Sequence, residues 1–385
     1  MAGIYIHVPF CKKRCNYCDF YKTTNTTLIV DYLNALSKEI SRKKNYFSFE
    51  KPLNTGIIEN IETIYFGGGT PSLLSLHDIE IIFKQLFSTF QISDTAEITF
   101  EINPDDVTFD FINGLKSIGV NRLSMGLQSF NDAYLKLMNR RHDSQQAFSS
   151  IETSIKAGIT NLSIDLIYGL PEMNMSIWEQ TLKTALKLSV QHLSAYHLTY
   201  ENGTVFYDWL TNGKLKEIPE DTSFHQFEML HNMAEDTGFE HYEISNFAKA
   251  DNYSKHNSNY WKGIPYLGLG PSAHSYNGIS RQWNVADIFG YCNAMNKGEN
   301  AWKKEILTEN NKINEFIMIR LRTKAGIDLD EFKNIFGITS QKCLLHSIQS
   351  FLITGDASII ENKLSLTLKG WFISDKIISA LMQTS

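Results

Sequence analysis

Three cysteines within eight residues constrain this chain more than any other feature of its sequence. They are Cys11, Cys15 and Cys18, with the aromatic residues Tyr17 and Phe20 between and after them. Thiolates are soft ligands that favour iron–sulfur clusters or zinc. A structural zinc site takes four ligands, and the sequence offers no fourth Cys or His at a suitable local spacing. On a cubane [4Fe–4S] cluster, three thiols would leave one iron open to a further ligand. Three reduced, buried thiols without a metal are the remaining alternative.

Short β-rich runs alternate with longer runs of helical periodicity up to about residue 200. The predicted strands are Ile4–Val8, Thr63–Phe66, Ile98–Glu101, Arg122–Met125, Leu162–Ile167 and His192–Leu198. The predicted helices between and after them are Leu28–Lys44, Ser75–Phe90, Thr108–Ile118, Asp132–Met138, Ser144–Lys156 and Ile177–Leu188. Six such units predict an α/β fold with a parallel sheet, because parallel strands need crossover connections. Periodicity leaves open a doubly wound sheet or a partial barrel, and in both the ligands gather at the C-terminal ends of the strands.

The cysteine spacing, Cys-x3-Cys-x2-Cys, resembles the cluster loop of the radical S-adenosylmethionine (SAM) superfamily. Within it, Tyr-Ile-His-Val-Pro-Phe-Cys and Tyr-Cys-Asp-Phe are similar to the oxygen-independent coproporphyrinogen III oxidase family. The dehydrogenase branch of that family has a further Cys where this chain has Phe20, so the chain resembles the HemW-type haem chaperone branch. The resemblance implies a partial (β/α)6 radical SAM barrel, a [4Fe–4S] cluster held by Cys11, Cys15 and Cys18, and SAM on the open iron.

Two motifs follow the second and third predicted strands. Glycines in Gly67-Gly68-Gly69-Thr70-Pro71 allow close backbone approach to a ligand and leave peptide N–H groups free, although such a run is also an ordinary turn. Glu101 could accept the hydroxyls of a ribose, or it could cap the next helix. The resemblance implies SAM contacts at the aromatic and strand-end positions Tyr5, Tyr17, Gly68, Gly69, Thr70 and Glu101.

Two further motifs follow the fourth and fifth predicted strands. Gly-Leu-Gln128-Ser-Phe leads to Asn-Arg140-Arg-His, and Arg140 could fork onto a carboxylate or stand in solvent on a helix. Asp165 ends the fifth strand, and a buried acid there is costly unless it is paired, so we expect it to face the pocket. The resemblance implies SAM contacts for all three, and Gln128 and Arg140 match a second SAM site of the dehydrogenase branch.

The pattern divides the chain into residues 1–200, a connecting region 201–285 that completes the barrel mouth, and a C-terminal domain 286–385. The connecting region has a predicted helix, Ser223–Asp236. The C-terminal domain has predicted helices Ile306–Thr323, Asp328–Phe336, Lys342–Thr354 and Trp371–Met382, and a strand or hairpin, Ser358–Thr367. It resembles the family's mostly helical, winged-helix-like cap. From Lys303 onward, the chain has 11 lysines and arginines and 9 aspartates and glutamates. This near balance of charge argues against a nucleic-acid-binding surface.

The connecting region contains two compact motifs. In His256-Asn-Ser-Asn-Tyr260-Trp261, His256 could present its imidazole to a haem iron, with the two aromatic rings against the macrocycle. The alternative, called the polar knot below, is a buried group of hydrogen-bonded side chains, His256, Tyr260 and Trp261, that fixes the loop to the barrel. The motif is similar to the His-Asn-x-x-Tyr-Trp signature of the HemW-type branch, which implies haem binding. Gly-Leu-Gly-Pro-Ser-Ala273-His274 resembles a family loop near the adenosine, which implies SAM contacts for these last two residues.

Composition indicates the class of protein and its compartment. A net charge of −6 argues against a binder of nucleic-acid backbones. Five cysteines, three of them clustered, do not make a secreted disulfide framework, and Cys292 and Cys343 are expected to be packing residues. The sequence has no signal-peptide pattern and no run of 18 apolar residues, so we expect a reducing, cytoplasmic setting. Peripheral membrane association stays open.

Two functions compete at this point. The resemblance implies a haem chaperone that binds haem and passes it to an unknown acceptor protein. It also implies an electron donor for the cluster, and the chain would act as a monomer or homodimer. The alternative is an enzyme that oxidatively decarboxylates two propionates of coproporphyrinogen III. Phe20 and the His256 motif favour the first function.

Overall fold

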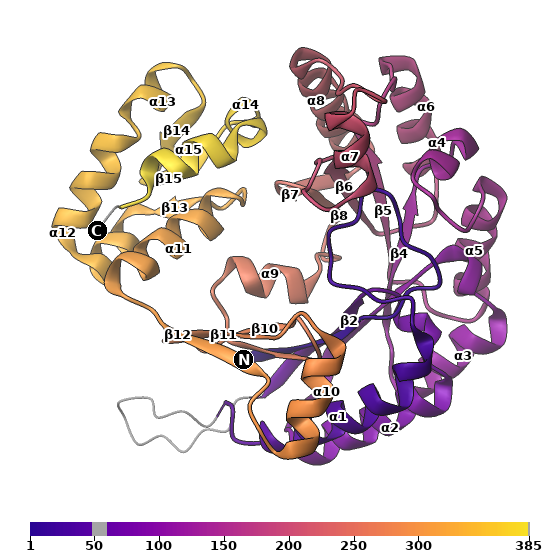
Figure 1. Cartoon of the computed structure of the whole chain (residues 1–385). Coiled ribbons are helices and arrows are strands. Elements are labelled where there is room, and N and C mark those ends of the chain that lie inside the picture. The colour runs from indigo at the N-terminus through magenta and orange to yellow at the C-terminus, as the bar shows by residue number, and fades with distance from the viewer. Residues whose placement is uncertain (48–59, 384–385) are drawn as a thin grey trace.

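A computed structural model describes residues 1–47 and 60–383 of the chain. Its centre is a curved sheet of six parallel strands in chain order (Figure 1). These strands are β1 (Ala2–Val8), β2 (Ile61–Gly68), β3 (Ile92–Ile102), β4 (Arg122–Gln128), β5 (Leu162–Tyr168) and β6 (His192–His197). All six predicted strands are confirmed, although several are longer than predicted, most of all β3, which begins at Ile92 where Ile98 was expected. The curvature corresponds to the partial barrel.

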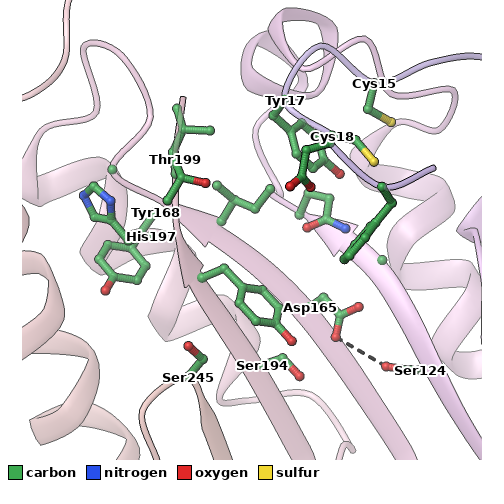
Figure 2. Close-up of a pocket in the computed structure, with 18 of the residues that line it drawn as sticks. Cys15, Tyr17, Cys18, Ser124, Asp165, Tyr168, Ser194, His197, Thr199 and Ser245 are labelled. Carbon is green, nitrogen blue, oxygen red and sulfur yellow. Dashed lines mark hydrogen bonds between the residues drawn. The ribbon is translucent and has the colours of Figure 1, made fainter. Parts of the chain in front are cut away.

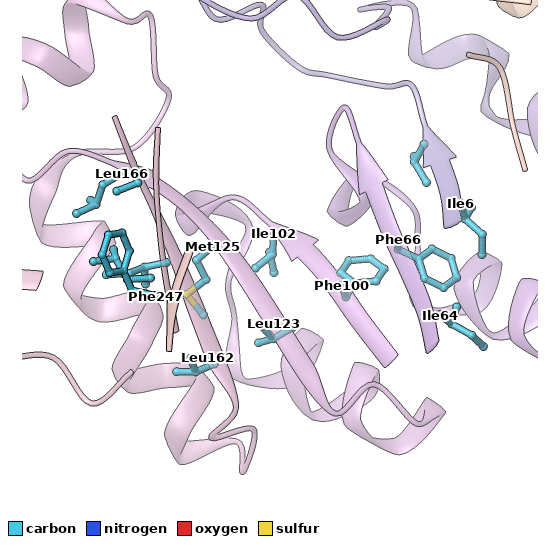
Figure 3. Close-up of a cluster of buried hydrophobic side chains, with 14 of the residues drawn as sticks. Ile6, Ile64, Phe66, Phe100, Ile102, Leu123, Met125, Leu162, Leu166 and Phe247 are labelled. Carbon is cyan, nitrogen blue, oxygen red and sulfur yellow. The ribbon is translucent and has the colours of Figure 1, made fainter. Parts of the chain in front are cut away.

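Six helices cover the outer face of this sheet (Figure 1): α1 (Ile29–Arg42), α2 (Leu76–Thr89), α3 (Phe109–Ile118), α4 (Asp132–Leu137), α5 (Ser144–Lys156) and α6 (Met175–Ala185). Outward side chains such as Ile64, Phe66 and Phe100 form the core beneath them (Figure 3). Phe66 stacks on Phe83 of α2 with ring centroids 5.2 Å apart. Because side chains alternate across a strand, the residues between these apolar positions face the concave side, where the polar residues lie.

The sheet continues beyond the six parallel strands at both edges. Next to β1 lie β9 (Tyr266–Leu269), β10 (His274–Tyr276), β11 (Ser280–Asn284) and β12 (Trp302–Ile306), and next to β6 lie β8 (Asn246–Lys249) and β7 (Phe239–Glu243). The connecting region also carries α7 (Val205–Thr211), α8 (Glu220–Asp236) and α9 (Lys255–Trp261), and α8 contains the predicted helix. We did not predict these edge strands, because they are short and lack a continuous apolar run.

The C-terminal unit is mostly helical and contains one small sheet. Its elements are α11 (Glu309–Leu321), β13 (Ile327–Asp328), α12 (Leu329–Ser347), α13 (Gln349–Ile353), β14 (Ala357–Ile360), β15 (Lys363–Leu366), α14 (Leu368–Phe372) and α15 (Ser374–Leu381). These match the predicted helices and hairpin. Within α12 the non-helical Gly337 (φ +83°, ψ +166°) separates two helical parts, as expected from the two helices predicted there. Helix α10 (Ile288–Lys297) packs on α1, and β12 pairs with β11, so both lie with the main sheet. We therefore propose a domain boundary near Leu307.

Candidate functional site

A cavity of about 950 Å³ opens at the C-terminal ends of the parallel strands. Four parts of the chain line it: the cysteine loop after β1, the concave face of the sheet with its strand-end loops, the connecting region including α8, and the C-terminal unit through α14 and the start of α15. Figure 2 shows Cys15 and Cys18 above the strand ends, with Asp165 and Ser194 on the strands below them. The cavity thus lies where ligands of parallel α/β folds collect.

All three clustered cysteines line this cavity, with Phe20 beside them. Cys11 is buried, and the Thr70 hydroxyl donates a hydrogen bond of 3.6 Å to its Sγ. Burial raises the pKa of the Cys11 and Cys18 thiols, and the nearby Lys22 ammonium opposes this at Cys18. These thiols are therefore sheltered at the cavity mouth.

The arrangement of the cysteines bears on which metal centre they suit. Within residues 1–47 and 60–383, no group of three or more His, Cys, Asp or Glu side chains converges as a site for a metal ion. Tetrahedral zinc would require such convergence, with sulfur atoms about 2.3 Å from one ion. A cubane cluster requires less, because each cysteine bonds to a different iron. Three thiols without a fourth local ligand suit a cluster with one open iron better than a tetrahedral zinc site.

The glycine motif lies directly against the cysteine loop. Gly68 has φ +105°, and a Cβ there would come within 2.6 Å of the His7 ring. A Cβ at Gly69 would lie 2.6 Å from the carbonyl oxygen of Phe10. These glycines let the end of β2 pack against the start of the cysteine loop, and Gly68, Gly69 and Thr70 all line the cavity.

Glu101, at the end of β3, is a half-buried acceptor in the cavity wall. Its carboxylate accepts hydrogen bonds from the Tyr65 hydroxyl (2.8 Å) and the Gly68 N–H (3.2 Å). Burial raises the pKa of Glu101 to about 7. The short helix that follows has Asn103 at its N-cap and no side-chain capping bond, so Glu101 does not cap it. The position leaves the carboxylate available to a ligand.

Arg140 joins β4 to the cysteine loop. Its Nη2 donates to the side chain of Asn103 and to the carbonyl of Gly126, both at 2.6 Å, and its Nη1 approaches Cys15 Sγ at 3.4 Å. Arg140 is thus not a solvated helical arginine. Gln128 lies beside it in the cavity lining, with φ +65°.

Asp165 faces the cavity from β5. The Ser124 hydroxyl donates to its carboxylate at 3.3 Å (Figure 2). Burial raises the pKa of Asp165 to about 6, while hydrogen bonding from Ser194 opposes the shift. Both carboxyl groups in the wall, Glu101 and Asp165, therefore titrate well above their usual range.

Several predicted site residues lie away from this cavity. Among the residues the structure describes, its lining excludes Tyr5, Ala273 and His274. The Tyr5 hydroxyl contacts His7 Nδ1 at 3.1 Å, beneath the glycine motif. Ala273 is buried in the loop before β10, and the His274 ring stacks on Trp283. The structure therefore does not bring these three residues to the proposed SAM site.

His256 also lies outside the cavity, as do Tyr260 and Trp261. The His256 side chain is 2% exposed, and both ring nitrogens are occupied: Nδ1 by the Thr63 hydroxyl and Nε2 by the Tyr260 hydroxyl, each at 2.8 Å. Burial lowers the pKa of His256 to about 3. This geometry corresponds to the polar-knot alternative rather than to an exposed haem ligand.

The cavity contains residues that the sequence reasoning missed. On the concave face these are Arg122, Ser163, Ser194, Tyr196 and His197, and from the helices they include Phe227, Trp371 and Phe372. Strand alternation could have identified Arg122, Ser163, Ser194 and Tyr196, because they stand at inward positions of predicted strands, whereas His197 lies at the very end of β6. No local signal marks the aromatic residues of α14, which reach the cavity only through tertiary packing.

The described residues contain no helix that is both long enough and apolar enough to cross a membrane.

Comparison with known proteins adds a second line of support. Residues 5–185 match the radical SAM superfamily, and residues 307–373 match the HemN C-terminal domain. The heme chaperone HemW of Bacillus subtilis is 34% identical, covering 99% of this chain and 99% of that protein. HemW of Lactococcus lactis is 32% identical, covering 98% and 96%. Among solved structures, the coproporphyrinogen III oxidase HemN of Escherichia coli, a radical SAM enzyme, superposes with a TM-score of 0.83 at 25% identity, covering 99% of this chain and 90% of HemN.

Proposed function

The chain belongs to the HemW family of the radical SAM superfamily, and from this premise we propose that it is a haem chaperone. It binds haem in the cavity and passes it to an acceptor protein. The observation that carries the proposal is the two-sided lining of the cavity. One wall holds three cysteines and Phe20, and the other holds aromatic side chains that suit a flat macrocycle, among them Phe227, Trp371 and Phe372.

The cysteine wall would hold the resident cofactors. Cys11, Cys15 and Cys18, which line the same cavity, would ligate a [4Fe–4S] cluster and leave one iron open. Such a cluster with an open iron supplies one-electron chemistry to SAM. Around it, Glu101 offers a buried carboxylate to SAM hydroxyls, and Arg140 is held in place beside Cys15. Gly68, Gly69, Thr70, Gln128 and Asp165 complete the cavity wall near SAM.

Phe20 favours the chaperone over the dehydrogenase. Its side chain is 65% exposed and stands at the cavity mouth, beside the cluster loop. It offers neither sulfur nor a polar group at the position where the dehydrogenase branch has a further cysteine. Small changes in positioning beside a reacting centre reduce catalysis strongly, so we propose that coproporphyrinogen is not turned over.

Two assays on the same anaerobically reconstituted protein test the proposal. One assay follows the haem Soret band while haem is titrated into the protein. It then measures how much of the bound haem passes to an acceptor protein that lacks haem. The other measures protoporphyrinogen formed from coproporphyrinogen III with SAM and a reductant. We expect haem binding and transfer without porphyrinogen oxidation. Porphyrinogen oxidation without stable haem binding would establish the dehydrogenase alternative instead.

The remaining partners follow from the chemistry of the site. The cluster needs an external electron donor, and the haem needs an acceptor protein. All five cysteines are free of disulfides, which supports a reducing, cytoplasmic compartment as part of this proposal. We propose a monomer or homodimer as the working form.

A further inference from the structure

Arg122, the first residue of β4, is a buried cation without an anionic partner. Its side chain is 1% exposed, and its Nε has no hydrogen-bond partner. Within residues 1–47 and 60–383, no hydrogen bond or ion pair involves its guanidinium. The other two arginines of the cavity wall are paired: Arg140 donates to Asn103 and Gly126, and Arg141 forms ion pairs with Asp105 and Asp106. A buried charge left unpaired is costly, so this position points to a ligand that is not part of the chain.

The polar groups around Arg122 are occupied by one another. His192 contacts the Ser163 hydroxyl at 2.7 Å and the Tyr242 hydroxyl at 2.8 Å. Burial lowers the pKa of His192, and the charge of Arg122 lowers it further, so this ring is neutral. Asp165 is near enough for the charge of Arg122 to lower its pKa, yet the two form no ion pair, and Asp165 accepts from Ser124 instead. None of these neighbours forms an ion pair or a hydrogen bond with the guanidinium.

Arg122 contributes directly to the cavity wall, as do Ser124 on the same strand, Ser163 on β5 and Ser194 on β6. A guanidinium presents a planar fork of N–H donors that matches a carboxylate. Aromatic side chains, Phe227 and Phe372 among them, line another part of the same cavity. The cavity thus suits a ligand with a flat apolar body and a carboxylate on its edge.

We propose that Arg122 binds a propionate carboxylate of the tetrapyrrole and so fixes how haem enters the barrel. This inference rests on the proposed haem-binding function. SAM also carries a carboxylate, but its site is expected beside the cysteines, at the other end of β4. From Arg122 to Gln128 the strand spans roughly 20 Å, so the guanidinium faces the deep end of the cavity.

The test compares haem with haem dimethyl ester, in which both propionates are esterified. Each is titrated into cluster-loaded protein: wild type, Arg122→Gln, Arg122→Lys and, as a matched control, Arg281→Gln. Arg281 is a half-buried arginine that pairs with Glu315 and lies outside the cavity lining. We expect wild type to prefer haem by about tenfold, or about 1.4 kcal/mol. Arg122→Gln should lose this preference while binding the ester normally, Arg122→Lys should keep part of it, and Arg281→Gln all of it.

Folding and SAM binding supply the other readouts. Because the guanidinium has no partner, ligand-free Arg122→Gln should melt no lower than wild type, and a clear fall would overturn the inference. An unchanged preference for haem in Arg122→Gln would overturn it too, as would a loss of SAM affinity with that preference intact. If wild type binds neither haem nor its ester, the proposed function itself fails. If wild type binds both equally, only the role of Arg122 fails.

Discussion

At the scale of single residues, the site is built from ionisable groups that the fold has removed from water. Glu101 and Asp165 are carboxyl groups whose pKa values burial raises to about 7 and about 6. His256 is the reverse case, because burial holds its imidazole neutral. The two carboxyl groups face the cavity and can accept hydrogen bonds from a ligand. Both ring nitrogens of His256, by contrast, are hydrogen-bonded to neighbouring hydroxyls.

The raised carboxyl pKa values predict how stability depends on pH. A carboxyl group whose pKa is higher in the folded than in the unfolded chain stabilises the protein at low pH. That stability is lost as the pH rises from about 4 to about 7. Glu101→Gln should therefore reduce the loss of unfolding free energy over this interval by about 1–3 kcal/mol. Urea unfolding of the cofactor-free protein at several pH values measures it. The exposed variant Glu80→Gln is the control, and an identical slope in Glu101→Gln and wild type would contradict the assignment.

His256→Ala separates the two interpretations of the His256 motif. The polar knot predicts a loss of about 1–3 kcal/mol in unfolding free energy, because the buried hydroxyls of Thr63 and Tyr260 lose their partner. The Soret band of the haem-loaded protein should keep its position. Unchanged stability together with a lost or shifted Soret band would instead make His256 the haem ligand that the family resemblance implies. His274→Ala, at an exposed position, serves as the control for thermal unfolding.

At the scale of elements, two segments far apart in the sequence line one cavity: the loop after β1 and helix α14. The strand–helix alternation and the cysteine loop could be predicted from the sequence, because periodicity and spacing are local. The edge strands β9 to β12 could not. Strand β12, Trp-Lys-Lys-Glu-Ile, is mostly exposed and gains its partner only by pairing with β11.

Helix α14 is predicted to contribute to haem affinity. Phe372 lines the cavity, and its ring lies 5.3 Å from that of Phe224 and 6.1 Å from that of Phe227, both on α8. An aromatic contact is worth about 0.5–1.5 kcal/mol, so Phe372→Ala should weaken haem binding by roughly twofold to tenfold. Haem titration measures this, with Phe289→Ala on the exposed face of α10 as the control. Equal affinities for all three proteins would remove α14 from the haem site.

At the scale of the whole molecule, the barrel places its apolar side chains outward, under the helices, and its polar side chains inward (Figure 3). The C-terminal unit then adds aromatic residues across the mouth. The sequence predicted the strand-end residues Glu101, Gln128 and Asp165, because a strand end is recognisable locally. It did not predict that the cavity extends down to Arg122, because this depends on how the sheet curves. It did not predict the wall at Phe372 either, because this depends on where the C-terminal unit docks.

The central claim is a three-cysteine cluster with one iron open to SAM, at the mouth of this cavity. The most direct test is the EPR spectrum of the reduced, anaerobically reconstituted protein with and without SAM, alongside its metal content. We predict about four irons per chain, a spectrum that changes when SAM is added, and loss of the signal in Cys11→Ala, Cys15→Ala or Cys18→Ala. Tightly bound zinc without iron, or a cluster spectrum that SAM leaves unchanged, would contradict the claim.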